Sequence, residues 1–453
     1  MLKGILILNG KKYSNGKHIE YICKNSDKNI EDIKLSYKVK LDFQKNVINK
    51  YVYYTDKIEN IMGNVNNYDA YVEYEIINIL KYGYNKEDKL FQKKCENITF
   101  PSLLREEDEF IFTIDGESTK DFDDAVSITD THINIYISNV PKILEEYDLF
   151  KYINKISSIY LPNKTINMLP KILSENLCSL KEDNVRNVFY MNINLETLEI
   201  SFNTKNVYIS KNFIYESEEL LKNNNYVKLS EEVKKLNNKY KYLENIKNSH
   251  EVIEFLMVLM NYHSSKILNK GIFRSCTRGD EMIKEIKFFF GGNGNYIKEK
   301  NGHEILKLDS YLHITSPIRR IVDIVNMLSL QIQLNLFNGN INNFIDENIG
   351  RIEEINAVNK KIRKMQNRVS LINLALTTNI LENIYEGYVF TLDGEVKNKN
   401  GTFSYLVYLL DLKLVLPLKS VSKLKFNEKY NFKIYLFMNE GVPKKKIKIE
   451  IIS

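Results

Sequence analysis

The first 82 residues alternate between apolar and polar positions in short runs, which predicts strands at 5–8, 18–23, 35–43, 47–54 and 71–80. Gly10, Gly16, Gly63 and asparagine-rich links separate these runs. Several short strands at such spacing are typical of a small β-barrel, and we expect one of the OB or cold-shock type. The charged stretch KEDKLFQKKCEN (86–97), with Pro101 soon after it, predicts a linker.

The centre of the chain mixes strand and helix patterns. A lysine-rich helical pattern covers residues 216–240, and a second predicted helix at 251–268 has Ile253, Met257, Met260 and Ser264 on one side. Apolar residues spaced mostly three and four apart predict a long amphipathic helix: Ile352, Ile355, Ile362, Met365, Val369, Ile372 and Leu376. We expect this helix to end at Gly387.

After residue 387 the strand pattern returns, at 388–392, 403–410, 413–418, 430–437 and 446–451. Five strands fit a second OB-type barrel. Such barrels bind single-stranded nucleic acids through a basic face with exposed aromatic rings. The candidates for that face are Tyr405, Tyr408, Lys444, Lys445 and Lys446, although the lysines also fit an ordinary solvated run.

The composition narrows the class of protein. The 453 residues carry 64 basic and 58 acidic side chains, so the net charge of +6 permits a local polyanion-binding groove without requiring one. No apolar run is long enough to span a membrane, and the N-terminal apolar stretch is too short for a signal peptide, so we expect a cytoplasmic protein. The four cysteines lie far apart with no CxxC pair, which argues against a zinc site and a disulfide framework.

Four aspartates lie close together within residues 110–128, FIFTIDGESTKDFDDAVSI. Strand-like runs on both sides place Asp115, Asp121, Asp123 and Asp124 on one connection, where their charges would repel one another without a cation. We expect magnesium, or manganese, because the order of residues does not match a calcium loop of the EF-hand type. The alternative is a solvated acidic loop.

The segment TIDGESTKDFDDAV resembles the signature of the ribonuclease II (RNB) family, and residues 158–186 and 303–323 match two further family stretches in the same order. The resemblance implies an α+β catalytic RNB-like domain flanked by small OB-type β-barrels, with divisions at 1–97, 98–384 and 385–453. It also implies a monomeric, processive 3′→5′ exoribonuclease that uses Mg²⁺ to degrade single-stranded RNA to nucleoside 5′-monophosphates.

Carried over residue by residue, the resemblance assigns metal binding to Asp115, Asp121 and Asp124, with Asp123 completing the site. Asp123, Asp124 and Arg319 are the implied catalytic residues, and Arg319 would grip the phosphate in the transition state. The implied RNA contacts are Tyr160, Glu254, His313 and Arg320. Three of the assigned residues have a plainer alternative: Arg319 could pair with Asp323 at a helix start, Tyr160 could be a core residue, and Glu254 an exposed helix residue.

The chain departs from the family pattern at Asn139, where aspartate is usual, at Ile321 and Val322, which replace Tyr-Pro, and at Ile305, which replaces glycine. The segment between the two central helices is also shorter than usual. These departures favour a rival hypothesis, a catalytically impaired RNA-binding protein. A third hypothesis takes Asp121 and Asp123 as the Asp-x-Asp motif of a nucleotide-sugar transferase, but it leaves SPIRR (316–320) unexplained.

Overall fold

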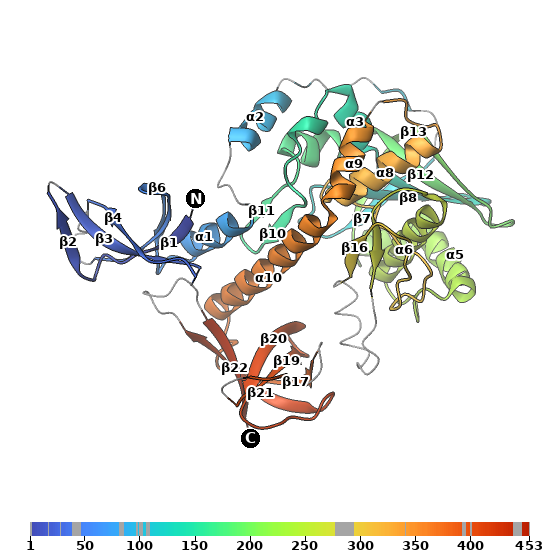
Figure 1. The fold of residues 1–453 in the computed structure, drawn as a ribbon. Coiled ribbons are helices and arrows are strands. Elements are labelled where there is room, and N and C mark those ends of the chain that lie inside the picture. Colours follow the sequence, from blue (N-terminus) through green and yellow to red (C-terminus); the bar gives the residue numbers. More distant parts are fainter. Residues whose placement is uncertain are drawn as a thin grey trace.

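The computed structural model describes residues 2–16, 18–27, 29–38, 47–80, 86–96, 98, 103–105, 109–276, 294–339, 341–391, 396–398, 401–437 and 446–452. Figure 1 shows an N-terminal domain, a larger central domain of sheet and helices, and a C-terminal domain. The long helix α10 (Ile352–Thr377) runs from the central domain toward the C-terminal one. The predicted α+β class is therefore confirmed.

The N-terminal domain is built on one antiparallel sheet with the strand order β2-β3-β1-β5-β6, in which β4 pairs with β3. The predicted strands at 5–8, 18–23, 35–43 and 47–54 match strands of this sheet, except that residues 39–43 lie outside the described residues. The strands are β1 (Leu2–Leu6), β2 (Lys12–Asn15), β3 (His18–Asn25), β4 (Ile33–Ser36), β5 (Lys50–Tyr54) and β6 (Ile58–Asn64).

Two predictions for the following segment are wrong. The strand predicted at 71–80 is part of helix α1 (Tyr68–Leu80), and the predicted linker at 86–97 contains helix α2 (Lys86–Cys95). Helix α1 is buried at most of its positions, against both the N-terminal sheet and α10, so its sequence shows no polar face. Phe91 and Cys95 of α2 pack into the core of the central domain.

The central domain contains a six-stranded sheet of order β13-β12-β9-β8-β7-β14. Only the β14–β7 pair is parallel among the pairings of this sheet. A hydrophobic core joins the sheet to helices α5 (Asn224–Tyr240) and α6 (Ser249–Ile267). The strands are β7 (Phe112–Asp115), β8 (Asp124–Ile128), β9 (His132–Ser138), β12 (Val185–Asn194), β13 (Ile200–Tyr208) and β14 (Lys211–Ile214).

The predicted central helices are confirmed with changed boundaries. The helix predicted at 216–240 is divided into α4 (Glu218–Lys222) and α5, because the side chain of Asn223 caps α5 by accepting hydrogen bonds from backbone N–H groups. Helix α6 covers the helix predicted at 251–268.

The central domain also contains shorter helices, helical turns and two-stranded pairs outside the six-stranded sheet. They are helices α3 (Val140–Glu146), α8 (Ile321–Gln333) and α9 (Asn342–Gly350), a 3₁₀ turn (Phe150–Tyr152), a π-helical turn (Leu173–Leu177), and the strand pairs β10 (Ile159–Leu161) with β11 (Lys164–Ile166) and β15 (Phe273–Ser275) with β16 (Asn295–Ile297).

Helix α10 confirms the predicted long amphipathic helix but ends ten residues before Gly387. The backbone of Thr378 is extended, with φ −137° and ψ 170°, so the helix ends there. The hydroxyls of Thr377 and Thr378 donate to the carbonyls of Asn373 and Leu374, at 2.8 and 2.6 Å. Gly387 instead lies in β17, where a Cβ would come within 2.8 Å of the Tyr408 carbonyl oxygen.

The C-terminal domain confirms all five predicted strands and adds the short β18. Its sheet has the order β18-β19-β17-β21-β22, with β20 on β19, and β20 also contacts β22, so the barrel is nearly closed. The strands are β17 (Ile384–Phe390), β18 (Val396–Lys397), β19 (Phe403–Leu409), β20 (Leu414–Ser420), β21 (Lys429–Phe437) and β22 (Lys446–Ile452).

The stacking face predicted on this barrel is wrong for its two tyrosines. Tyr405 and Tyr408 are buried, with exposed fractions of 3% and 9%. Lys444 and Lys445 lie outside the described residues, and Lys446 begins β22.

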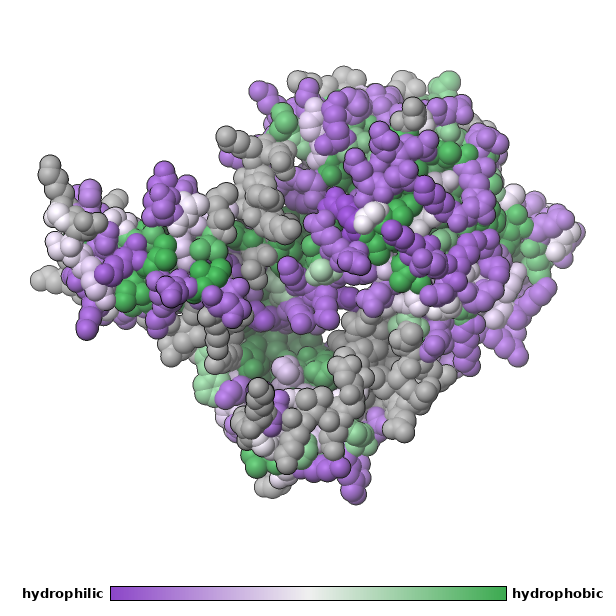
Figure 2. Space-filling view, in the orientation of Figure 1, coloured by the Kyte–Doolittle hydropathy of each residue, from purple (hydrophilic) through white to green (hydrophobic). Residues whose placement is uncertain are grey.

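Hydrophilic residues cover most of the visible face of the central domain, whereas hydrophobic residues gather over parts of the N-terminal domain (Figure 2). None of the helices in the described ranges is long and apolar enough to cross a membrane.

Candidate active site

The acidic connection joins two neighbouring strands of the central sheet. Asp115 is the last residue of β7 and Asp124 the first of β8, and Asp121 and Asp123 lie between them, as predicted. Both strands are buried along most of their length, so the two ends of the connection are fixed by the core. The sheet therefore holds Asp115 and Asp124, and Asp121 and Asp123 lie on the connection between them.

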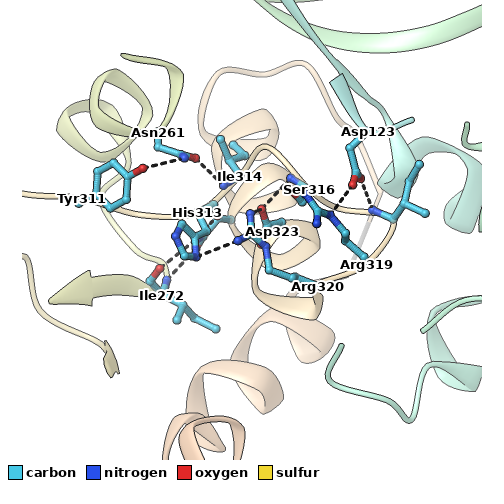
Figure 3. A network of polar contacts seen from close by, with 12 residues as sticks. Asp123, Asn261, Ile272, Tyr311, His313, Ile314, Ser316, Arg319, Arg320 and Asp323 are labelled. Atoms are coloured by element: carbon cyan, nitrogen blue, oxygen red, sulfur yellow. Dashed lines mark hydrogen bonds and ion pairs between the residues drawn. The ribbon is translucent and has the colours of Figure 1, made fainter. Parts of the chain in front are cut away.

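Asp123 and Arg319 meet across 196 residues of sequence. The buried Asp123 carboxylate accepts a hydrogen bond from the Ile318 backbone N–H through Oδ1 and one from Arg319 Nε through Oδ2, both at 2.9 Å (Figure 3). Arg319 also donates from Nη2 to the Ser316 hydroxyl at 3.1 Å. These contacts fix the guanidinium, and its side chain remains 44% exposed.

A cavity of about 750 Å³ adjoins these residues. Of the nine predicted site residues, seven line it: Asp115, Asp124, Tyr160, Glu254, His313, Arg319 and Arg320. Asp123 lies behind Arg319, and Asp121 accepts a hydrogen bond from the Tyr160 hydroxyl at 2.7 Å. The structure therefore brings the predicted residues to one place.

Tyr160 and Glu254 do not fit their plainer alternatives. Tyr160 is 38% exposed on the hairpin β10–β11, so it is not a core residue. Glu254 lies on α6 against the cavity and is partly buried; burial, with the charge of Glu251, raises the pKa of its carboxyl.

The pairing with Asp323 that the sequence allowed for Arg319 is made by Arg320, whose Nη2 lies 2.8 Å from Asp323 Oδ1. Asp323 is fully buried and also accepts from the Ser316 backbone N–H at 2.8 Å. The Arg320–Asp323 pair stabilises the turn before α8. Arg319 instead faces the aspartates and the cavity.

His313 acts as a neutral imidazole in this arrangement. Burial and the neighbouring Arg320 hold its pKa well below the usual value. Its Nδ1 lies 2.8 Å from the Tyr296 hydroxyl and 3.4 Å from Arg320 Nη1, and because a guanidinium can only donate, Nδ1 is the acceptor. The proton is therefore on Nε2, which makes His313 a hydrogen-bond donor at the cavity wall.

The aspartates carry more negative charge than their surroundings compensate. Burial raises the pKa of Asp115, Asp123 and Asp124 to about 7 each, and the charges of neighbouring aspartates add to the shift. Arg319 opposes it at all three. Asp115 Oδ2 is buried without a hydrogen-bond partner among the described residues. This environment favours a bound cation.

The donor set fits Mg²⁺ or Mn²⁺ at Asp115 and Asp124, because carboxylate oxygens are the ligands these ions prefer. Asp123 fits less well as a ligand, since both of its oxygens already accept hydrogen bonds. Within the described part of the chain, no three His, Cys, Asp or Glu side chains are grouped so that they could hold one ion. Mg²⁺ commonly takes one or two carboxylates and completes its shell with water and substrate phosphate.

The raised pKa values predict how the metal-free protein responds to pH. The folded state holds protons on these carboxyls up to about pH 7, whereas the unfolded state releases them near the ordinary value of 3.8. Stability should therefore fall as pH rises from about 4 to about 7. We expect the melting temperature in EDTA to be several degrees higher at pH 5.5 than at pH 8.

Asp115→Asn removes one of the like charges, so its melting temperature should depend less on pH and exceed that of the parent at pH 8. Calorimetry across this pH range, with and without Mg²⁺, measures both effects. A melting temperature in EDTA that rises with pH would contradict the assignment of these carboxyls as destabilised anions.

The sequence did not identify several residues of the cavity. Tyr215 and His250 stack with ring centroids 3.7 Å apart at its wall. Helix α10 contributes Asn356, Asn359, Arg363 and Gln366. These four residues step by three, four and three, so a polar stripe beside the apolar stripe of α10 was the available signal. Tyr215 and His250 belong to no comparable pattern.

The residues that depart from the family pattern differ in whether they line the cavity. Asn139 does not line the cavity: its amide donates to Asn187 Oδ1 at 2.8 Å and accepts from Gln331 Nε2 at 2.9 Å. Ile321 and Val322 are the first two residues of α8 and are buried in the core. Ile305 does line the cavity, so of these positions it is the one that affects its shape.

Part of the chain is similar in sequence to known proteins. The family model described as RNB domain matches residues 104–261, which include the four aspartates, Tyr160 and Glu254 but not Arg319. Ribonuclease R of Mycoplasmopsis pulmonis is 31% identical over 194 residues, which are 39% of this chain and 26% of that protein. The matched segments make up 12–26% of the length of the curated relatives.

Two solved structures are similar over most of the chain. Mycoplasma genitalium RNase R, in complex with ribose-methylated single-stranded RNA, has a TM-score of 0.69 and 14% identity, covering 99% of this chain and 89% of that one. Yeast Ssd1, described as a pseudonuclease, has a TM-score of 0.61 and 14% identity, covering 95% and 66%. At such identities the likeness concerns the fold. Residues 104–261 therefore match an RNB domain, and the same segment carries the resemblance to the ribonuclease II (RNB) family.

Proposed function

We propose that this protein is a magnesium-dependent, processive 3′→5′ exoribonuclease that hydrolyses single-stranded RNA to nucleoside 5′-monophosphates. The observation that carries the proposal is the meeting of the aspartates and Arg319 at a cavity that Tyr160 also lines. Its curated relatives named ribonuclease R and exoribonuclease 2 support the same reaction class.

Each residue has a role in this proposal. Asp115 and Asp124 would hold Mg²⁺, or Mn²⁺, which makes a bound water more acidic and stabilises charge on the phosphate. Asp121, the third ligand that the family resemblance implies, accepts from the Tyr160 hydroxyl and would have to turn from it to reach the same ion. Asp123 holds Arg319, and the free edge of the guanidinium faces the place where phosphate charge would develop. Tyr160 offers a ring for stacking, and Glu254, His313 and Arg320 offer polar contacts along the cavity.

The proposal extends to the organisation of the protein. We propose divisions at 1–97, 98–384 and 385–453, which the three separate large sheets support. We further propose a monomer that acts in the cytoplasm, as the sequence indicated. The flanking barrels would add phosphate contacts to an RNA whose 3′ end lies in the cavity.

A labelled single-stranded RNA tests the reaction. With Mg²⁺, a 5′-labelled RNA should shorten from its 3′ end without accumulating intermediates, and a uniformly labelled one should release nucleoside 5′-monophosphates. EDTA should stop both. RNA that binds but stays uncut with Mg²⁺ or Mn²⁺ would favour the second candidate, a catalytically impaired RNA-binding protein, which the similarity to yeast Ssd1 supports.

A matched DNA oligonucleotide tests the substrate class. Phosphate contacts do not distinguish the two sugars, whereas polar groups at the cavity such as Glu254 can contact a 2′-hydroxyl. We expect DNA of the same sequence to bind within about tenfold of RNA yet to resist cleavage. Equal rates of degradation for both polymers would reject an RNA-specific cavity.

A further inference from the structure

Tyr160 lies on a short hairpin, β10–β11 (residues 159–166), here called the Tyr160 hairpin. Its strands pair Tyr160 with Thr165 across a two-residue turn at Pro162 and Asn163. Ile159 and Leu161 point into the protein, with exposed fractions of 0% and 9%, and Tyr160 faces the opposite way. An isolated pair of three-residue strands is not stable alone, so its neighbours must fix its position.

Helix α1 holds the turn end of the Tyr160 hairpin. Lys164 forms an ion pair with Glu73, and Asn163 Nδ2 donates to Asp69 Oδ1 at 2.8 Å. Asp69 and Glu73 lie four residues apart on one face of α1. Neither residue lines the cavity.

Helix α10 holds the Tyr160 hairpin from its other side, where Gln366 Nε2 donates to the Tyr160 carbonyl at 2.9 Å. One hydrophobic cluster joins all three elements: Tyr71 of α1, Ile159 and Leu161 of the hairpin, and Ile362, Met365 and Val369 of α10. Figure 1 shows β10 and β11 beside one end of α1 and near the middle of α10.

Helix α1 is itself fixed to both neighbouring domains. Its buried Glu75 lies 3.8 Å from Lys3 Nζ of the N-terminal sheet and 2.9 Å from Arg368 Nη1 of α10. Tyr51 of the N-terminal sheet packs against Tyr74, with ring centroids 4.6 Å apart. Movement of the N-terminal domain would therefore be transmitted to α1 and to the contacts that it makes.

We infer that α1 positions Tyr160 for the substrate through Glu73 and Asp69, so that the N-terminal domain influences the shortest RNA that the cavity retains. The inference rests on the proposed function. The Tyr160 hydroxyl reaches Asp121 at 2.7 Å, and this contact is lost if the hairpin tilts. Glu73, Asp69 and Lys164 are positioning residues, since they act through Tyr160 and do not contact the cavity.

The expected effect is selective for short substrates. A long RNA is held by many phosphate contacts, whereas a short one depends on the stacking ring near the cavity. Glu73→Lys places two cations together at the hairpin turn. We expect it to raise KM for a short oligonucleotide about threefold to tenfold and to leave kcat on long RNA unchanged. Tyr160→Ala, which removes the stacking ring, should lengthen the limit product, the shortest fragment left at the end of digestion, and we expect Glu73→Lys to lengthen it in the same direction.

The charge-exchanged variant Glu73→Lys with Lys164→Glu restores the ion pair and should restore the parent's limit product and KM. Asp130→Lys is the matched control, because Asp130 pairs with Lys228 on the exposed surface away from the cavity. An unchanged limit product and KM in Glu73→Lys, or failure of the exchanged pair to restore them, would overturn the inference. If Glu73→Lys fails to fold, Glu73→Gln and Asp69→Asn give the same comparison.

A second readout does not depend on hydrolysis. 3-Fluorotyrosine incorporated at position 160 reports the surroundings of that ring by ¹⁹F NMR in the full chain. We expect its resonance to shift or broaden in Glu73→Lys, to return in the exchanged pair, and to stay unchanged in Asp130→Lys. A protein that cuts no RNA but shows these shifts would refute the proposed function and keep the positioning role; an unmoved resonance would refute that role.

Discussion

Asp123→Asn is expected to lower RNA hydrolysis to the limit of detection, at least about a thousandfold, while the protein stays folded and still binds RNA. Asp123 Oδ1 and Oδ2 each accept one hydrogen bond, from the Ile318 N–H and from Arg319 Nε. An asparagine amide has one acceptor and one donor group, so its NH₂ must face one of these two donors. Arg319 also loses its ionic partner and with it the fixed direction of the guanidinium.

The fold should tolerate this change because burial already disfavours the Asp123 anion, and the neutral amide removes that cost. Rates on labelled RNA, melting temperature and RNA affinity should be measured together. Asp130→Asn changes an exposed aspartate of the same domain and serves as the control. Activity of Asp123→Asn within a few-fold of the parent, in a folded protein, would contradict a catalytic role for the aspartate loop.

Local patterns in the sequence correctly predicted the strands and helices that bury only one face. The alternation in β20 and β21 and the spacing along α10 survive in the structure, because each of these elements has one face in the core and a more exposed face opposite. Helix α1 is covered by both the N-terminal sheet and α10, so the pattern that would distinguish a helix from a strand is missing at 71–80.

The tyrosines of the C-terminal barrel show a related limit. Tyr405 and Tyr408 are three residues apart on β19, so they point to opposite faces of the sheet. Tyr405 lies in the barrel core, and Tyr408 packs beside Phe390 on the other face. Sequence alternation identifies the two faces, but it does not indicate that both are covered.

The roles of the two arginines of SPIRR depend on tertiary structure. By sequence spacing, either arginine could pair with Asp323. In the structure, the turn before α8 places Arg320, not Arg319, against Asp323. Arg319 reaches Asp123, 196 residues away, a contact that no local pattern encodes. The family resemblance assigned both residues to the catalytic site without pairing them. The metal assignment stays a prediction, supported by the buried Asp115 Oδ2, which has no hydrogen-bond partner in the described ranges.

The structure also gives a physical reason for Asn139. Its side chain lies between two amides, donating to Asn187 and accepting from Gln331. A carboxylate cannot donate, so an aspartate would require the Asn187 amide to turn. The hydrogen-bonding groups of Asn139 therefore match those of Asn187 and Gln331. Because Asn139 does not line the cavity, it is weaker support for the hypothesis of a catalytically impaired protein.

Arg319→Lys is expected to reduce the single-turnover rate about a hundred- to a thousandfold, with RNA affinity changed by less than about threefold. In the parent, Arg319 Nε holds Asp123 and Nη2 holds Ser316, and the rest of the planar group faces the cavity. A lysine has a single nitrogen. If that nitrogen keeps Asp123, it has no rigid second edge to offer a phosphate, so the loss should fall mainly on the transition state.

Affinity measured in EDTA and single-turnover rates measured with Mg²⁺ separate the two effects for Arg319→Lys. The control is Arg351→Lys, which alters an arginine paired with Glu354 at 3.2 Å, outside the cavity. That variant should match the parent in both measurements. A defect of Arg319→Lys confined to affinity would make Arg319 a substrate-holding residue, because a group that binds ground state and transition state equally changes binding without changing the rate of the bound complex.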